Sequence, residues 1–245
     1  DPVVRSAQQQ KQFITDASHE LKTPLSVLSG FIETLQGPAK NDAVAREKFL
    51  NIMQEQTTHM TDLVQDLLAL SKMDIESDAP LDTITIPELI RSVFQALELK
   101  AKTREQKLVL KENDTMPPFK ARSTELFRVF QNLIDNALKY GNAQSSISVT
   151  LDVEVDTPPD PVPALYIPTQ YLRISIRNDG AAIPEEEIPH LFERFYRMES
   201  NMSVSGTGLG LAIASEIVHK YQGTISVESA PESGTSFIVR LPSAL

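Results

Sequence analysis

Residues 13–35, FITDASHELKTPLSVLSGFIETL, decide how the first third of this chain folds. The stretch predicts one amphipathic helix, because its apolar residues occupy the a and d positions of a seven-residue repeat: Ile14, Ala17, Leu21, Leu28, Phe31 and Leu35, with Leu25 and Ile32 beside them. His19 falls at an f position of this repeat and therefore points away from the apolar seam. Pro24 follows five residues later and should bend the helix just beyond the histidine.

A second helix is predicted after the interruption at Gly37-Pro38, with Asn41 or Asp42 as its N-cap. Its apolar seam is Phe49, Ile52, Met53, Gln56, Met60, Leu63, Leu67 and Leu70. Two long helices joined by a short turn indicate an antiparallel helical hairpin. One hairpin has too little apolar surface to close a core, so we expect a homodimer with a four-helix bundle. A monomeric hairpin packed on the rest of the chain is the alternative.

The composition of the 245 residues excludes several classes of site and partner. The chain has no cysteine, which excludes disulfides, thiolate metal sites and thiol nucleophiles. A net charge of −10 argues against nucleic acid as a partner. No apolar run approaches the roughly 18 residues of a membrane helix. The chain starts at Asp1 rather than at methionine, so we expect a fragment of a longer protein.

The pattern changes near residues 77–80, which predicts two domains, 1–78 and 79–245. In the second domain, predicted strands (83–86, 108–110, 146–155, 171–177, 224–228 and 236–241) alternate with predicted helices (87–101, 124–140 and 209–221). The alternation indicates an α/β sandwich with helices on one face of a mixed sheet, so the whole chain is expected to be α+β. Residues 157–170 hold five prolines and read as an extended hairpin loop.

A single histidine on a polar helix face is usually a solvated surface residue, but three neighbours, Glu20, Thr23 and the helix-bending Pro24, favour a functional role for His19. Glu20 can accept a proton from the imidazole. Thr23 lies one turn along the same face. A zinc site of the H-E-x-x-H kind is excluded, because Thr23 stands where the second histidine would be.

A polar stripe on the predicted helix 124–140 is the second candidate site: Glu125, Arg128, Asn132, Asn136 and Lys139. A solvated face is the ordinary interpretation, but asparagine is a poor helix former and two lie here four residues apart. Their amide oxygens suit Mg²⁺, and a lysine suits phosphate. Three glycines, Gly206, Gly208 and Gly210, precede another helix, where backbone N–H groups can bind phosphate.

These segments resemble the boxes of sensor histidine kinases. FITDASHELKTPL is similar to the phosphoacceptor box, NLIDNALKYG to the N box, and HLFERFYR to the F box. SGTGLGLAIASEIVHK and ESGTSFIVRLP are similar to the later glycine-containing segments. The resemblance implies a dimerisation and phosphotransfer hairpin followed by a GHKL (Bergerat) ATP-binding domain. The hairpin segments GFIETLQGPA, REKFL and EQTTHM also resemble those of phosphate-regulon sensors.

The resemblance implies a role for each site residue. His19 would be phosphorylated with Glu20 as its base, Thr23 would position water for a phosphatase reaction, and Asn136 would bind Mg²⁺. ATP would be bound by Asn132, Asn136, Lys139, Tyr140, Asn178, Gly180, Arg194, Arg197, Gly206, Thr207, Gly208, Leu209, Gly210 and Thr235. Residues from about 184 to 205 would form a lid over ATP.

One segment departs from the family pattern. The adenine-recognising box reads D-x-G-x-G, whereas this chain has IRNDGAAIP, with Asn178 in place of the aspartate and Ala182 in place of the second glycine. Asp179 should point to the opposite face of its strand from Asn178. An asparagine oxygen can still accept a hydrogen bond from the adenine amino group.

The resemblance therefore implies a homodimeric kinase that moves the ATP γ-phosphoryl to His19 and then to an aspartate on a response regulator receiver domain. A GHKL ATPase that drives conformational change is one alternative, although it has no use for a histidine on a hairpin. A signalling scaffold without catalysis is another, and it would need a broken ATP site. The resemblance also implies that the full-length protein is anchored upstream of these residues in the bacterial inner membrane, with this part in the cytoplasm.

Overall fold

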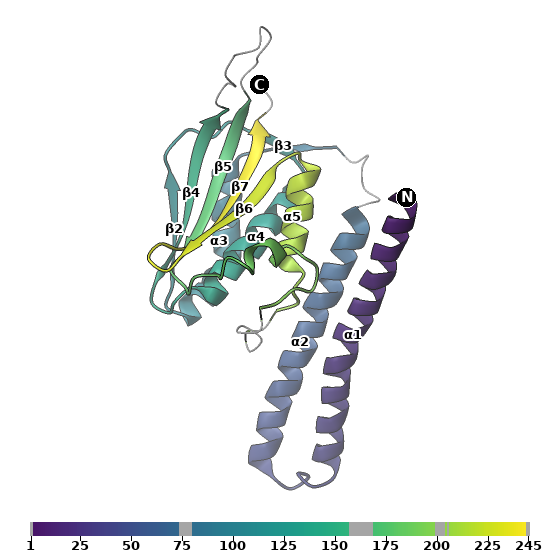
Figure 1. The fold of residues 1–245 in the computed structure, drawn as a ribbon. Coiled ribbons are helices and arrows are strands. Elements are labelled where there is room, and N and C mark those ends of the chain that lie inside the picture. Colours follow the sequence, from purple (N-terminus) through teal and green to yellow (C-terminus); the bar gives the residue numbers. More distant parts are fainter. Residues whose placement is uncertain (1, 74–79, 157–168, 199–203, 205, 244–245) are drawn as a thin grey trace. The chain divides into compact units, whose positions relative to one another are not determined.

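The computed structural model describes every residue of the chain except 1, 74–79, 157–168, 199–203, 205 and 244–245, and it leaves the side chains of 2–12 and 72–73 undescribed. The chain divides into two compact units (Figure 1). Unit 1 is Asp1–Ile75 with Arg194–Leu209, and unit 2 is Glu76–Glu193 with Gly210–Leu245. The predicted boundary at residues 78 and 79 touches the undescribed stretch and stays a prediction.

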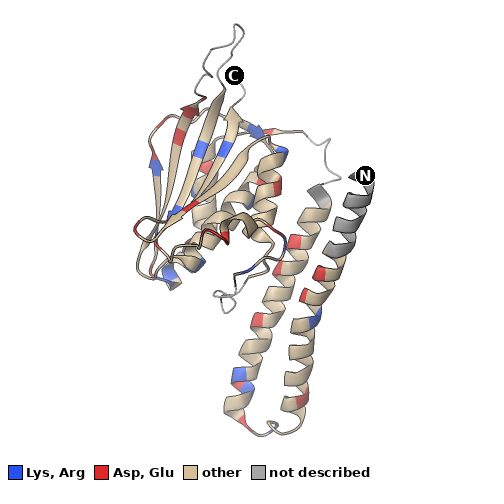
Figure 2. Ribbon diagram, viewed as in Figure 1, with Lys and Arg blue, Asp and Glu red and all other residues tan. Residues whose placement is uncertain are grey.

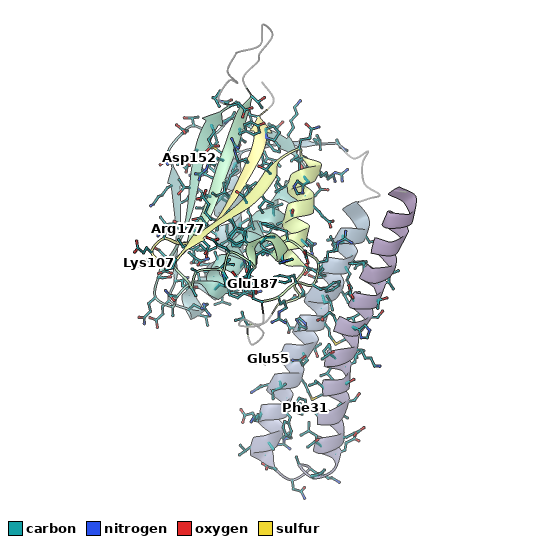
Figure 3. All side chains as sticks on the ribbon, in the orientation of Figure 1. Phe31, Glu55, Lys107, Asp152, Arg177 and Glu187 are labelled. Atoms are coloured by element: carbon teal, nitrogen blue, oxygen red, sulfur yellow. The ribbon has the colours of Figure 1, made fainter. Side chains whose placement is uncertain are left out.

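Unit 1 contains the predicted helical hairpin. Its helices are α1 (Pro2–Gln36) and α2 (Ala43–Met73). Asp42 caps α2, because its Oδ1 accepts hydrogen bonds from the backbone N–H groups of Val44 and Ala45 at 3.0 and 2.9 Å. Phe31, labelled in Figure 3, stacks on Phe49 with ring centroids 4.9 Å apart. Acidic residues recur along both helices (Figure 2).

The two helices bury only a narrow seam. Ala17 of α1 and Leu63 and Leu70 of α2 are buried. Ile14 was predicted in the seam but stays exposed in the single chain. So do several large apolar side chains that flank the seam: Leu25, Val27, Ile32, Leu50, Val64 and Leu68. A hairpin that exposes this many apolar groups has an unfilled second face.

Unit 2 is the predicted α/β sandwich. A five-stranded sheet has the order β2 (Lys107–Glu112), β4 (Ser146–Val155), β5 (Gln170–Asn178), β7 (Gly234–Ser243) and β6 (Thr224–Ala230). The β2–β4 pair is parallel and the other pairs are antiparallel. β1 (Asp82–Ile84) and β3 (Phe119–Ala121) form a separate two-stranded sheet.

Three helices, α3 (Ile86–Thr103), α4 (Ser123–Tyr140) and α5 (Gly210–Lys220), cover one face of the five-stranded sheet (Figure 1). A short 3-10 turn, η1, spans Ile188–His190. The core lies between the helices and the sheet. Alternate residues of β5 (Leu172, Ile174 and Ile176) point into it with no exposed surface, as do Phe130 and Leu133 of α4. The mixed sheet with helices on one face is thus confirmed.

The element bounds correct the sequence prediction in two places. The strand expected at 83–86 ends at Ile84, because Thr85 is the N-cap of α3 and Ile86 is its first residue. The three-residue strand β3 was not predicted, since its length carries too little alternation to detect. The proline-rich loop predicted at 157–170 lies almost wholly outside the described residues. In the described part of the chain no helix is long and apolar enough to cross a membrane.

A partly buried polar cluster joins the start of α4 to the C-terminal end of α5. The Glu125 carboxylate accepts hydrogen bonds from Lys220 Nζ and Tyr221 Oη, both at 2.7 Å, and from Arg122 at 3.1 Å. Burial raises the pKa of Glu125, but the hydrogen bonds of Lys220, Tyr221 and Arg122 outweigh it and lower the pKa. Burial and the hydrogen bond to Glu125 raise the pKa of Tyr221 to about 12. Glu125 is therefore a structural anchor of α4.

Candidate functional site

His19 lies on the exposed side of α1, as its f position predicts. The helix continues through Pro24, which cannot donate a backbone hydrogen bond to the carbonyl of Glu20. Thr23, the residue before Pro24, donates a hydrogen bond from its hydroxyl to the carbonyl oxygen of His19, one turn back along the helix, at 3.3 Å. An exposed imidazole on a helix, with a carboxyl group and a hydroxyl nearby, is accessible to a large reactant.

The face of α4 that does not enter the core carries the two predicted asparagines. Asn132 uses its Nδ2 to donate a hydrogen bond to the carbonyl oxygen of Gly210 at 2.8 Å. A Cβ atom on Gly210 would lie 3.5 Å from the Asn132 side chain. Asn132 therefore holds the first turn of α5 against α4, and the backbone N–H groups of that turn lie beside the polar stripe.

Lys139 is held by a carboxylate on its own helix. Its Nζ lies 2.9 Å from Asp135 Oδ2, and Lys100 Nζ of α3 lies 2.8 Å from Asp135 Oδ1. Burial raises the pKa of Asp135, but the charge of Lys139 and the hydrogen bonds of both lysines outweigh it and hold the pKa below its usual value. Asp135 was not predicted as part of the site, although its i,i+4 spacing to Lys139 is a detectable signal.

Asn178 ends β5 with its side chain buried at 3% exposure. Its Oδ1 accepts a hydrogen bond from the backbone N–H of Gly180 at 2.9 Å. Asp179 is exposed, and its Oδ1 accepts from the backbone N–H of Asn142 at 3.3 Å. The two side chains therefore face opposite ways, as the strand period predicts. Ala182 is not among the residues with positive φ, so its methyl group causes no backbone strain.

Two glycines bring backbone close to Asn178. If Gly180 carried a Cβ atom, that atom would lie only 2.0 Å from the Tyr140 carbonyl oxygen. A Cβ atom on Gly234, where φ is +71°, would lie only 2.1 Å from the carbonyl oxygen of Asn178. Thr235 pairs with Asn178 across β5 and β7. The predicted residues Tyr140, Asn178, Gly180 and Thr235 thus form one cluster where β5 meets the end of α4.

Ser229 of β6 supports this cluster and was not predicted. Its hydroxyl lies 2.7 Å from Thr235 Oγ1 and accepts from the backbone N–H of Ile183 at 2.9 Å. The side-chain amide of Asn142 donates to the carbonyl oxygen of Asp179 at 2.7 Å. These contacts fix both ends of residues 178–183. A lone serine and a loop asparagine carry no sequence signal for such a role.

Residues 194–209 belong to unit 1 and carry the remaining predicted contacts. Arg194 lies over the Phe13 ring at 5.0 Å, and Arg197 donates to the carbonyl oxygen of Val204. Thr207 donates to Asp66 at 2.8 Å and accepts from the backbone N–H of Leu209. A Cβ on Gly208, where φ is +70°, would lie 2.7 Å from the Phe195 backbone. A Cβ atom on Gly206 would have no neighbouring atom within 4 Å.

The donor set around α4 suits a nucleotide with its cation better than a bare metal ion. Within the described residues no group of three or more His, Asp or Glu side chains can hold a metal ion. An amide oxygen such as that of Asn136 supplies one hard ligand, so Mg²⁺ would need phosphate oxygens and water for the rest. The free second lone pair of the Asn178 oxygen suits an amino group such as that of adenine.

Comparison with known proteins identifies the family. The histidine kinase-, DNA gyrase B- and HSP90-like ATPase family matches residues 121–245, and the His Kinase A (phospho-acceptor) domain matches residues 9–76. The chain belongs to the histidine kinases. It is 33% identical over 243 residues to the sensor protein kinase WalK of Staphylococcus epidermidis, a match that covers 96% of this chain and 37% of WalK. The chain thus spans little more than a third of that relative.

Solved histidine kinase structures share the fold. The catalytic domain of histidine kinase ThkA superposes with a TM-score of 0.54 at 27% identity, covering 67% of this chain and 96% of that domain. A structure of ThkA in complex with the response regulator protein TrrA gives a TM-score of 0.75 at 21% identity, covering 98% of this chain and 64% of that one. The predicted fold class and family are confirmed, whereas the individual site residues stay predictions.

The predicted contact of Asn178 with adenine is tested by replacing Asn178 and Asp179 separately. We expect Asn178→Ala to weaken binding of a non-hydrolysable ATP analogue by about tenfold or more, because a buried acceptor is lost. Asp179→Ala, whose side chain faces the other way, should cost about twofold at most. Calorimetry measures both affinities, and thermal melting checks that each variant folds.

Asn178→Asp tests the same contact with a carboxylate in place of the amide. A carboxylate accepts a stronger hydrogen bond than an amide, so binding should tighten about fivefold. If Asp179→Ala proves the more damaging change, the adenine contact belongs to Asp179.

Proposed function

We propose that this histidine kinase chain is the catalytic core of a two-component sensor, which transfers the γ-phosphoryl of ATP to His19. The observation that carries the proposal is the exposure of His19 on α1, in a chain whose other unit has the ATPase fold. The ring nitrogen of His19 forms a bond to the γ-phosphorus, and the bond to the β,γ-bridging oxygen breaks with its electron pair leaving on ADP. Glu20 takes the proton from the other ring nitrogen.

In unit 2, the residues proposed to hold the nucleotide are those gathered around α4 and the end of β5. Asn178 would accept from the adenine amino group, and Lys139 would bind phosphate. Bound Mg²⁺, held by Asn136, would neutralise charge on the phosphates. Tyr140, Gly180, Asn132, Gly210 and Thr235 would shape the site. From residues 194–209, we assign phosphate contacts to Arg194, Arg197 and the backbone of Gly206, Thr207, Gly208 and Leu209.

The second transfer would go to an aspartate on a response regulator. An aspartate oxygen attacks the phosphorus, the N–P bond breaks, and the electron pair returns to the His19 imidazole. The ThkA relative was solved with a response regulator protein, which supports a partner of this class.

We also propose that the full-length protein is anchored in the bacterial inner membrane with this part in the cytoplasm, which fractionation of the full-length protein tests. The phosphate-regulon resemblance stays a prediction.

The phosphoacceptor assignment is tested by His19→Ala. This variant should lose more than about 95% of the acid-labile label from γ-labelled ATP, because the nucleophile is gone. Binding of the ATP analogue should stay within about twofold of wild type. The control is His59→Ala on α2, which should keep full labelling. Acid-labile label retained by His19→Ala would rule out His19. Label absent from the wild-type chain despite normal nucleotide binding would favour a scaffold or a conformational ATPase.

We propose that Thr23 positions water when the kinase dephosphorylates its regulator. Thr23→Ala should then slow loss of phosphate from the regulator about tenfold or more, while labelling of His19 changes by less than about twofold. Thr34→Ala is the matched control, because Thr34 also donates from its hydroxyl to the carbonyl four residues earlier in α1, at 2.7 Å. Equal losses in both reactions would show that Thr23 acts on the helix itself.

We propose that the exposed apolar residues flanking the hairpin seam are covered by a second copy of the chain. The residues Ile14, Leu25, Ile32, Val64 and Leu68 support this, together with the match to a phosphoacceptor domain that forms dimers in its family. Leu68→Glu should convert a dimer into a monomer, because an unpaired carboxylate in an apolar seam costs several kcal/mol. Light scattering measures the mass. Leu99→Glu, at an exposed leucine of α3, is the control and should leave the dimer intact.

A further inference from the structure

Asp135 of α4 bridges two lysines from different helices. Lys100 of α3 lies 2.8 Å from one carboxylate oxygen, and Lys139 of α4 lies 2.9 Å from the other. The three residues line a cavity of about 240 Å³ together with Thr103, Arg104 and Leu138. The Asp135 side chain is only 17% exposed, whereas the Lys100 side chain is 61% exposed. The carboxylate is thus mostly buried, with one cation at each oxygen, and both of these cations reach solvent.

A mostly buried carboxylate is less stable without a cation beside it. Removing one partner of an ion pair leaves the other charge uncompensated, and the resulting cost increases with the burial of that charge. If Asp135 had Lys139 alone, any movement of Lys139 toward another anion would leave the carboxylate unpaired. Because Lys100 occupies the second oxygen, Lys139 can leave or share its contact while Asp135 keeps a cation.

Lys139 is the lysine that the proposed function assigns to a phosphate of ATP, and the following inference rests on that assignment. To place its charge on a phosphate, the ammonium group must weaken its contact with Asp135. The Asp135 carboxylate and the phosphate therefore compete for one cation. Lys100 decides how strongly Asp135 competes, because a carboxylate that already has a partner holds a second cation less tightly.

We propose that Asp135 and Lys100 are positioning residues for the phosphate-binding lysine: Asp135 holds Lys139 while the site is empty of nucleotide, and Lys100 keeps Asp135 paired when Lys139 turns to phosphate. The lysine on α3 thereby sets the affinity for ATP without touching it. Neither residue is expected to change the chemical step once ATP is bound.

The experiment is a double-mutant cycle on the 245-residue chain, with a non-hydrolysable ATP analogue as the probe. Lys100→Met should weaken binding about three- to fivefold, the range of a partly exposed ion pair. The same change in an Asp135→Asn background should have less than about a twofold effect, since the competing charge is gone. Autophosphorylation of Lys100→Met should show a raised KM for ATP with an unchanged kcat.

The control is Lys102→Met, which removes the same charge from the same helix. Lys102 is 69% exposed and pairs with Glu98 at 2.6 Å instead of with Asp135. This variant should change the affinity by less than about twofold. Lys100→Gln serves as a second variant if Lys100→Met folds poorly, with thermal melting as the check. Equal losses for Lys100→Met and Lys102→Met, or equal losses with and without Asp135→Asn, would overturn the inference, because both outcomes describe a general loss of positive charge.

Lys139→Met separates this inference from the proposed function. If it leaves the affinity for the analogue unchanged, Lys139 does not contact phosphate and the assignment of the nucleotide site fails. If it weakens binding while Lys100→Met behaves like its control, the site stands and only the role of Lys100 and Asp135 is overturned. In the Lys139→Met background, Lys100→Met should have no further effect beyond that of Lys102→Met.

Discussion

The packing of α4 against the sheet is the constraint on which unit 2 depends. Leu126, Phe130, Leu133 and Ala137 have no exposed surface, so this face cannot rotate without opening the core. The opposite face is therefore fixed as well, and it carries Asn132 and the other polar groups. Because Asn132 also binds the first turn of α5, the same packing places the N-terminal end of a second helix. One apolar stripe thus positions several groups of the site.

The two mostly buried carboxylates of α4 are each paired with basic side chains. Glu125 and Asp135 lie on the same helix and are mostly enclosed, and each has two basic partners within 3.1 Å. Their carboxylates stay ionised because the cations outweigh the effect of burial. Asn178, more buried than either, is a neutral amide, and its oxygen is satisfied by a backbone N–H. A neutral group at this point avoids the desolvation of a charge, while its oxygen keeps a second acceptor position.

The hairpin and the sandwich differ in how completely they bury their apolar side chains. The sandwich buries a complete core, whereas the hairpin leaves large apolar groups such as Leu25 and Leu68 exposed. A second copy of the hairpin would cover them, and His19 would then stay on the outside of the bundle. His19 is exposed because the heptad pattern excludes it from the seam, so its imidazole is accessible to the reactants of the two proposed transfers.

The periodic features of this protein can be predicted from its residue order. Heptad spacing places His19 outside the seam, and the helical stripe separates Asn132 and Asn136 from Phe130 and Leu133. At the end of β5 the period of two buries Asn178, and Asp179, the next residue, is exposed. These are local properties, because a side chain's direction follows from the backbone repeat. The partners that those side chains meet depend on the tertiary structure. The pairing of Lys100 with Asp135 joins residues 35 apart, and the contact of Ser229 with Thr235 requires the β6–β7 register. Such contacts depend on how helices and strands pack, which no repeat in the sequence encodes.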